Sequence, residues 1–366
     1  MMRRLLLFLF FLMVIGVAAF FAEQWEFFAS GPNAARGGAM LVWIKPGERP
    51  AAIARDLQSA RVIKNAALFR FGVWLRRGNT ALKAGEYAIP SRASMADVLG
   101  ILIGGKSIQH RITAAEGLTS AMIFEIVRKN SVLMGDAGTV PAEGSLLPET
   151  YLFIRGTTRA EMLARMARAQ QRLLAKEWPA RVSNLPFNLP ESAVMLASIV
   201  EKETAIPEER RHVAAVFINR LKLGMKLQSD PTVIYGLTKG YPLGRGIRAS
   251  ELQAATPYNT YVVSGLPPTP ICNPGKASLE AVLRPENSAD LYFVANGTGG
   301  HVFTSSIQEH EKNVARWRKV EQESAAPSIP VPARSTTPVP VLRGGSQGPP
   351  APPPRPYVKR HRVRRH

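Results

Sequence analysis

The stretch Leu196-Ala197-Ser198-Ile199-Val200-Glu201-Lys202-Glu203-Thr204 is a helical pattern that ends in two closely spaced carboxylates. Glu203 follows Ile199 and Val200 at the i+4 and i+3 spacings of a helix, so it continues their apolar stripe, whereas Glu201 falls near the opposite side. A charge is unfavourable on such a stripe, so we expect the Glu203 carboxyl to hold its proton near neutral pH. That property suits a general acid for a glycosidic oxygen. A solvated, charged helix end is the open alternative.

Two segments that follow this helix are rich in aromatic and hydrogen-bonding groups: LQSDPTVIYG at 227–236 and TPYNTY at 256–261. Sugars are bound by stacking on aromatic faces and by polar partners for their hydroxyls, and binding groups often lie on loops held by a rigid scaffold. Turn formation and packing are the open alternatives. The candidate substrate-binding residues are Gln228, Ser229, Asp230, Tyr235, Tyr258, Asn259 and Tyr261.

No second carboxylate stands out as a nucleophile or as a base for water. Asp230 is one candidate, although Asp before Pro is often a turn former. Two chemistries therefore stay open. One is hydrolysis with two carboxylates. In the other, a single glutamic acid protonates the leaving oxygen, the sugar's own 6-hydroxyl closes on the anomeric carbon, and a 1,6-anhydro sugar is released without consuming water.

The sequence predicts an α+β fold in two parts. In a small region over 40–135, strands are expected at 40–44, 84–90 and 110–113, and helices at 50–57, 66–75, 94–102 and 120–129. A larger mixed domain with a helical core is expected over 136–322, where a capping box of Thr158 and Glu161 opens a long helix. Its further helices are predicted at 190–205, 208–223, 278–283 and 306–321, with loops over 230–274 and a hairpin of 291–295 and 301–304.

The N-terminus carries Arg3 and Arg4, followed by an apolar run over 5–22. A helix that spans a bilayer needs about 20 apolar residues, so this run is near the lower limit. Because positive charge marks the cytoplasmic side, we expect an uncleaved transmembrane helix with the rest of the chain outside. A signal peptide cleaved near Gly16 is the alternative. The expected segments are an anchor over 1–25 and a spacer over 26–39.

The formal net charge of +20 would suit a nucleic-acid-binding protein, but its distribution argues against one. The Pro-rich tail over 323–366 has many basic residues and no acid from Ser324 onward, and its composition predicts disorder. No zinc-finger, helix-turn-helix or RNA-binding motif accompanies the charge, so no nucleic-acid partner is expected. A single cysteine, Cys272, excludes an internal disulfide and a cysteine-rich metal site. We expect neither a metal nor a cofactor.

Several motifs together resemble those of the YceG-like endolytic murein transglycosylases. They are ASIVEKET at 197–204, VFINRL at 216–221, LQSDPTVIYG at 227–236, YNTY at 258–261, GLPP at 265–268 and YFVA at 292–295. The resemblance covers about 42 to 317, most of the chain. It aligns Glu203 with the catalytic glutamate of the family, and Glu201 is the fallback if the register is shifted by one pair.

The resemblance implies an enzyme that cuts the β-1,4 bond between N-acetylmuramic acid and N-acetylglucosamine within nascent peptidoglycan strands. Such cleavage leaves 1,6-anhydro ends and limits strand elongation, near the peptidoglycan synthases. The resemblance also implies a LysM-like region over 40–135 and a single-pass inner-membrane protein, with a cytoplasmic N-terminus and a periplasmic catalytic domain. A non-catalytic peptidoglycan-binding scaffold is the alternative. The basic tail departs from the family core, and its role stays open.

Overall fold

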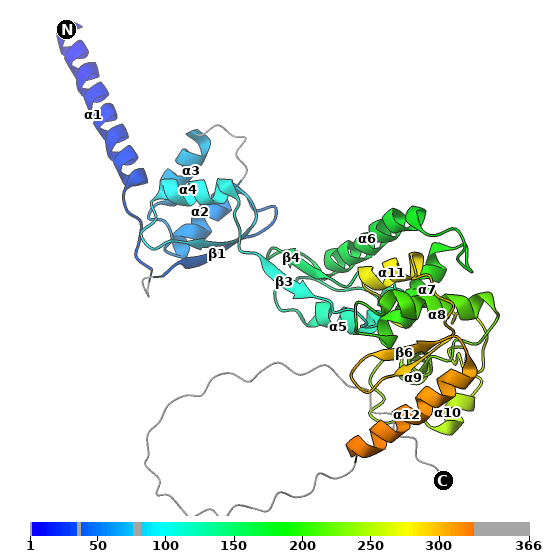
Figure 1. The fold of residues 1–366 in the computed structure, drawn as a ribbon. Helices are drawn as coiled ribbons and strands as arrows, with labels where there is room; N and C mark the ends of the chain where they lie inside the picture. Colours follow the sequence, from blue (N-terminus) through cyan, green and yellow to red (C-terminus); the bar gives the residue numbers. More distant parts are fainter. Residues whose placement is uncertain (1, 35–37, 76–81, 326–366) are drawn as a thin grey trace, which may run out of the picture. The chain divides into compact units, whose positions relative to one another are not determined.

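The computed structural model describes residues 2–34, 38–75 and 82–325, which form two compact units (Figure 1). The first unit takes in the described residues of Met1–Ala115 together with Ala121–Pro141 and Pro148–Arg168. The second takes in Glu116–Ser120, Ala142–Leu147 and the described residues from Ala169 onward. Each unit is thus assembled from separate stretches of chain, whereas we expected one boundary near residue 135.

The first unit combines helices with two antiparallel strand pairs. Its elements in chain order are α1 (Met2–Phe28), β1 (Met40–Ile44), α2 (Pro50–Ser59), α3 (Ala66–Leu75), β2 (Gly85–Ile89), α4 (Met95–Gly104), β3 (His110–Thr113), α5 (Ser120–Lys129) and β4 (Thr150–Phe153). Strand β1 pairs with β2, and β3 pairs with β4. The strands and helices predicted for this region are confirmed, and β4 is an addition that the pattern did not indicate.

The core of the first unit forms where the apolar stripes of its helices meet the β1–β2 pair. The stripe predicted for the 94–102 helix is buried in α4, where Val98, Leu99 and Leu102 have no exposed surface. Helix α4 begins after Ser94, whose hydroxyl accepts the N–H of Asp97 while the Asp97 carboxylate accepts the N–H of Ser94. This capping box satisfies N–H groups that would otherwise be unpaired at the helix start.

The N-terminal segment forms one continuous helix, α1. In the part of the chain that the structure describes, we find no helix that is both long enough and apolar enough to cross a membrane. Several side chains of the apolar run over 5–22 lie outside the described residues, as does nearly all of the predicted tail over 323–366.

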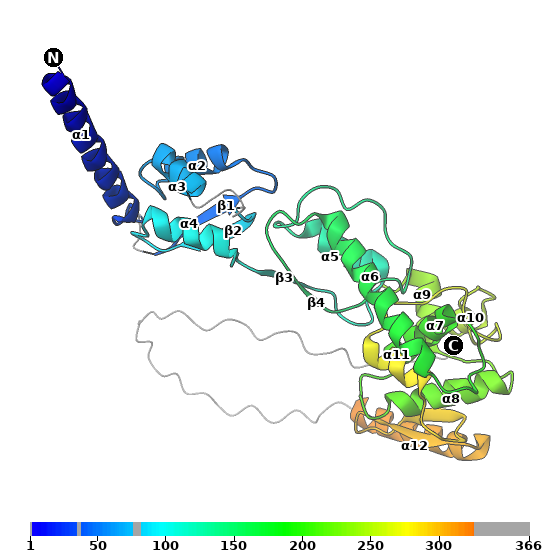
Figure 2. The ribbon, with the colours of Figure 1, turned by 90° about the horizontal axis from the view of Figure 1, so that it is seen from above.

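The second unit is built around helices that pack against one another. Helix α6 (Arg159–Glu177) begins in the first unit and ends in the second, and a 3₁₀ turn (Trp178–Ala180) follows it. The remaining elements are α7 (Pro190–Glu203), α8 (Arg210–Lys222), α9 (Asp230–Thr238), α10 (Ala249–Gln253), α11 (Lys276–Leu283), β5 (Tyr292–Ala295), β6 (His301–Thr304) and α12 (Ile307–Ala325). Helices α7, α8 and α11 pack pairwise (Figure 2). Helix α12 lies along the β5–β6 hairpin.

Helix α7 is surrounded by protein on most sides. Leu196, Ala197 and Ile199 have no exposed surface, although they point in different directions around the helix axis. The predicted helices, the final hairpin and the capping box of Thr158 and Glu161 are confirmed. The prediction of loops throughout 230–274 is wrong, because α9 and α10 lie within that interval.

Candidate active site

Glu203 is the last residue of α7, and the helix ends there for a local reason. Thr204 adopts an extended conformation, and its buried hydroxyl accepts the N–H of Ile206 over 3.0 Å. Pro207 follows and cannot continue a helix. The Glu203 side chain is therefore half-buried at the edge of the unit's core, where it remains partly accessible to a ligand.

Ser229 provides a hydrogen bond to Glu203. Its Oγ donates to Oε1 of Glu203 over 2.6 Å, and the Ser229 side chain is almost fully buried. Ser229 is also the N-cap residue of α9, but its hydroxyl makes no bond to that helix because it is directed to the carboxylate. The carboxylate thus lies near the N-terminal end of α9, where the helix dipole favours negative charge.

A second carboxylate and a tyrosine lie beside this pair. The hydroxyl of Tyr261 donates to Oδ1 of Asp230 over 2.6 Å. Burial, with the negative charges of Asp230 and Glu203, raises the pKa of Tyr261 well above its usual value, so the phenol stays protonated and acts as a donor. Glu203, Ser229, Asp230 and Tyr261, all candidates from the sequence, are therefore brought together.

Arg220 on α8 is a member of the site that the sequence reasoning missed. It is 7% exposed, and its guanidinium donates to the carbonyl of Leu291 over 2.6 Å and to that of Leu227 over 3.0 Å. Burial lowers the pKa of Arg220 below its usual value, and the negative charge of nearby Glu203 opposes that effect. In the sequence, Arg220 follows the apolar Phe217 by three residues, so the two lie on the same side of a helix. Because Phe217 is buried, this spacing could have indicated that Arg220 is buried too.

Gln228 occupies a strained backbone conformation next to Ser229. Its φ is +53°, in the left-handed region that residues with a Cβ rarely adopt. The N–H of Gln228 donates to the carbonyl of Thr260 over 3.0 Å, and its side-chain oxygen accepts from Arg220 over 3.2 Å. Its side chain is exposed, so it remains available to a ligand.

Tyr235 and Tyr258 form a separate cluster around a carboxylate that the sequence did not single out. Their rings lie 4.9 Å apart at an angle of 60°. The Tyr235 hydroxyl donates to Glu143 over 3.1 Å, and the Tyr258 hydroxyl is paired with Thr269 over 2.8 Å. Burial raises the pKa of Glu143, and burial and Glu143 raise that of Tyr235. Tyr235 is buried and Tyr258 is half-buried, so within this cluster the ring of Tyr258 is the surface that a sugar could contact.

Asn259 is fully buried, and its amide holds the loop together. Its Nδ2 donates to the carbonyls of Leu252 and Ala254 over 3.0 and 2.7 Å, and its Oδ1 accepts the N–H of Tyr261 over 3.0 Å. With no exposed surface it has no direct access to a ligand. Its assignment as a substrate-binding residue is therefore corrected to that of a residue that positions Tyr261.

Glu201, the fallback for the catalytic acid, points elsewhere. Its Oε2 accepts the N–H of Gly275, the N-cap residue of α11, over 2.9 Å. Burial and the charge of Glu201 raise the pKa of neighbouring Glu116. The two carboxylates of the EKE motif therefore project to different partners, as the helical spacing predicts, and only Glu203 lies beside Ser229, Asp230 and Tyr261.

Within the described ranges, no three or more His, Cys, Asp or Glu side chains are placed to hold a metal ion together. Cys272 is fully buried, and its thiol donates to the carbonyl of Ser198 over 3.4 Å. Burial raises the pKa of this thiol well above its usual value, so it is a packed thiol and not a nucleophile.

Comparisons with known proteins agree with the motifs. The chain is 29% identical over 300 residues to a Bacillus subtilis protein named "Endolytic murein transglycosylase", covering 74% of this chain and 82% of that protein. Two proteins of the same name from Streptococcus pneumoniae are 28% identical over 358 residues, covering 84% of this chain and 64% of theirs. The crystal structure of a yceG-like protein from Listeria monocytogenes is 27% identical with a TM-score of 0.46, covering 75% of this chain and 98% of that one. The profile of the YceG-like family matches residues 42–316, so this chain belongs to the YceG-like family.

Proposed function

We propose that this chain is an endolytic peptidoglycan lytic transglycosylase. It cleaves the β-1,4 bond between N-acetylmuramic acid and N-acetylglucosamine within a glycan strand and leaves a 1,6-anhydro end. The observation that carries the proposal is the position of Glu203, half-buried beside Ser229 at the start of α9, with the Asp230–Tyr261 pair adjacent. The names of the relatives from Bacillus and Streptococcus support the same activity.

In the proposed reaction Glu203 acts first as an acid and then as a base. Its carboxyl protonates the glycosidic oxygen, the bond from that oxygen to the anomeric carbon breaks, and positive charge develops on the sugar. The 6-hydroxyl of the same sugar then bonds to the anomeric carbon, and its proton returns to the Glu203 carboxylate. The Ser229 hydroxyl and the N-terminus of α9 stabilise that carboxylate while it is charged.

Asp230 supports the competing hydrolytic chemistry. As a second carboxylate near Glu203, it could orient a water on the sugar, which would give a reducing end. Its bond from Tyr261 instead suits a fixed negative charge that stabilises the positive sugar. The identity of the product decides between the two roles.

The test is digestion of purified glycan strands by the full chain in detergent, with mass spectrometry of the products. If the fragments produced by cleavage within the strands carry anhydro-muramyl ends, the enzyme is a lyase. If the fragments carry reducing ends, it is a hydrolase. Glu203→Gln keeps the shape of the side chain but removes the proton donor, so turnover should fall about 10²–10⁴-fold. Glu201→Gln is the matched control and should change turnover much less. Absence of cleavage by the unsubstituted chain would favour the non-catalytic scaffold.

The proposal extends to location and to the first unit. Arg3 and Arg4 before the uncharged run over 5–22, in the continuous helix α1, support a single-pass anchor with the catalytic unit outside the cytoplasm, near the peptidoglycan synthases. The order β1–α2–α3–β2, with β1 and β2 antiparallel, supports a LysM-like glycan-binding region. Resistance of the protein to carbonate extraction from membranes tests the anchor.

A further inference from the structure

Helix α3 leaves a group of large apolar side chains exposed. It buries Leu68 and Phe69, whereas Trp74 is 70% and Leu75 50% exposed, and Phe71 stacks on Trp74 with ring centroids 5.7 Å apart. Soluble proteins rarely expose several large apolar side chains side by side, so we expect this side of α3 to contact lipid or another protein.

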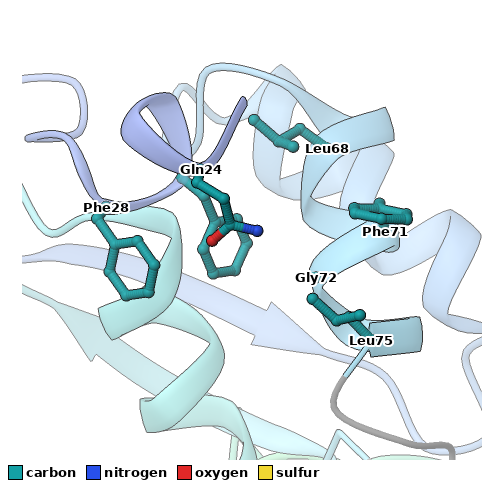
Figure 3. Close-up of a pocket in the computed structure, with 7 residues that line it drawn as sticks. Gln24, Phe28, Leu68, Phe71, Gly72 and Leu75 are labelled. Carbon is teal, nitrogen blue, oxygen red and sulfur yellow. The ribbon is translucent and has the colours of Figure 1, made fainter. Parts of the chain in front are cut away.

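The end of α1 adds to the same apolar face. Trp25 is 81% and Phe28 61% exposed, while Phe27 between them is buried. The Phe27 ring fills the space above Gly72 of α3, where a Cβ would collide with it. Figure 3 shows the resulting apolar pocket, with Phe28 of α1 across from Leu68, Phe71 and Leu75 of α3. We call Trp25, Phe28, Phe71, Trp74 and Leu75 the aromatic face.

The chain that follows α1 is hydrogen-bonded to the first unit. The N–H of Gly31 donates to the carbonyl of Arg92, and the N–H of Arg92 donates to the carbonyl of Pro32, both over 3.1 Å. The N–H of Ala34 donates to Ser91 Oγ over 2.9 Å. Because Gly31 packs directly on Ala93, the two chain segments are closely apposed. Residues 31–34 of the predicted spacer are therefore held against the first unit just after the end of α1.

Helix α1 also exposes apolar side chains nearer its N-terminus. Leu7, Leu12 and Val17 are each about half exposed, as are the other described apolar side chains between them. Trp25 lies two turns beyond Val17, about 12 Å along the helix. Tryptophan is enriched where a membrane meets water, because its ring is apolar and its N–H is polar.

We propose that the aromatic face lies in the interfacial layer of the phospholipid bilayer and holds the first unit against the membrane surface. The proposal rests on the anchor assigned to α1 above. A bilayer fits better than a second protein, because the face includes the end of the same continuous helix whose exposed apolar side chains over 7–17 belong to the proposed anchor. Exposed Arg70 on α3 adds positive charge that suits anionic headgroups.

The test is site-directed spin labelling of the full chain in vesicles of phosphatidylethanolamine and phosphatidylglycerol. Labels at Trp74→Cys, Leu12→Cys and Leu41→Cys are compared for collision with oxygen, which enters the bilayer, and with a water-soluble nickel complex, which does not. Leu41 on β1 is the matched control, because it is an apolar side chain with a similar exposure of 65%. The unsubstituted chain corrects for any labelling of buried Cys272.

We expect the Leu12 label to be deep in the bilayer, the Trp74 label to be at headgroup depth and the Leu41 label to be in water. If the Trp74 label meets the nickel complex as often as the Leu41 label while Leu12 is deep, the aromatic face is not in the bilayer although the anchor stands. A Trp74 label shielded from both reagents would indicate a protein partner and overturn the proposal. A Leu12 label in water would overturn the anchor and this proposal together.

Discussion

Replacing Ser229 with alanine removes the hydroxyl that donates to Oε1 of Glu203 over 2.6 Å. A hydrogen bond to a charged group contributes about 1.5–3 kcal/mol. In the proposed reaction the Glu203 carboxyl becomes charged only as it gives up its proton. Loss of the hydrogen bond should therefore raise the free energy of the transition state more than that of the bound substrate. It corresponds to a decrease in kcat of roughly 10- to 160-fold with little change in KM. The assay is a steady-state rate of anhydro-end formation from purified glycan strands.

The matched control is Ser198→Ala on the same helix as Glu203. Ser198 is equally buried, and its hydroxyl donates to the carbonyl of Met195 over 2.7 Å and accepts the N–H of Ile271 over 2.9 Å. Its loss should lower the free energy of unfolding by about 1–3 kcal/mol and leave kcat nearly unchanged per folded molecule. If Ser229→Ala and Ser198→Ala lowered kcat to the same extent at equal folded fraction, the role assigned to Ser229 would be refuted.

Three further outcomes follow from the structure. Arg220→Lys keeps the charge but loses the planar fork that reaches several acceptors, so kcat should fall about tenfold while the thermal midpoint drops by several degrees, as read by glycan digestion and by circular dichroism. Burial raises the pKa of Glu143 above 4.5, so the stability that this carboxyl contributes is complete below about pH 4.5 and is lost as the pH rises through the raised pKa. Urea unfolding at pH values from 4.5 to about 7 should therefore show the unsubstituted chain losing stability relative to Glu143→Gln. Ending the chain after Ala325 should leave activity on isolated strands nearly unchanged, and a large loss would show that the tail belongs to the site.

The elements that sequence predicts well are those whose cause is local. The stripe of α4 repeats at helical spacing and is buried as predicted, because a single side of the helix meets the core. Thr158 and Glu161 cap α6 through bonds that span three residues, with the Thr158 N–H donating to Glu161 over 2.8 Å. Such features depend on neighbours in the chain, so the pattern contains the information that they need.

Helix α9 was missed because its own residues favour other structures. Its sequence DPTVIYGLT has a proline, a glycine and β-branched residues, all with low helix propensity. The helix is stabilised by burial of Pro231, Thr232, Val233 and Tyr235, which is a property of the fold and not of the segment. One signal was present, since Asp230 and Pro231 are residue types common in the first turn of a helix. We interpreted them as a turn, and so the N-terminus that faces Glu203 went unrecognised.

Periodicity separated Glu201 from Glu203 but could not show what each of them faces. Both sides of α7 are covered, so a carboxylate on either side could have been half-buried. The partners that distinguish the two are far away in sequence: Ser229 lies 26 residues from Glu203, and Gly275 lies 74 residues from Glu201. Contacts at such separations are made by the tertiary fold, so they cannot be predicted from the local pattern of a single sequence.

Arg220 explains how the strain at Gln228 is tolerated. A residue with a Cβ loses roughly 1–2 kcal/mol in the left-handed region, so the loop would relax if nothing held it. Arg220 donates to the carbonyl of Leu227 just before the strained residue and to the side chain of Gln228 itself. With the loop held there, Ser229 is placed with its hydroxyl on Glu203. A buried cation on α8 thus supports the orientation of the acid on α7 through the loop that joins α8 to α9. Substitutions at Arg220 should therefore affect kcat and stability together, whereas those at Ser229 should act mainly on kcat.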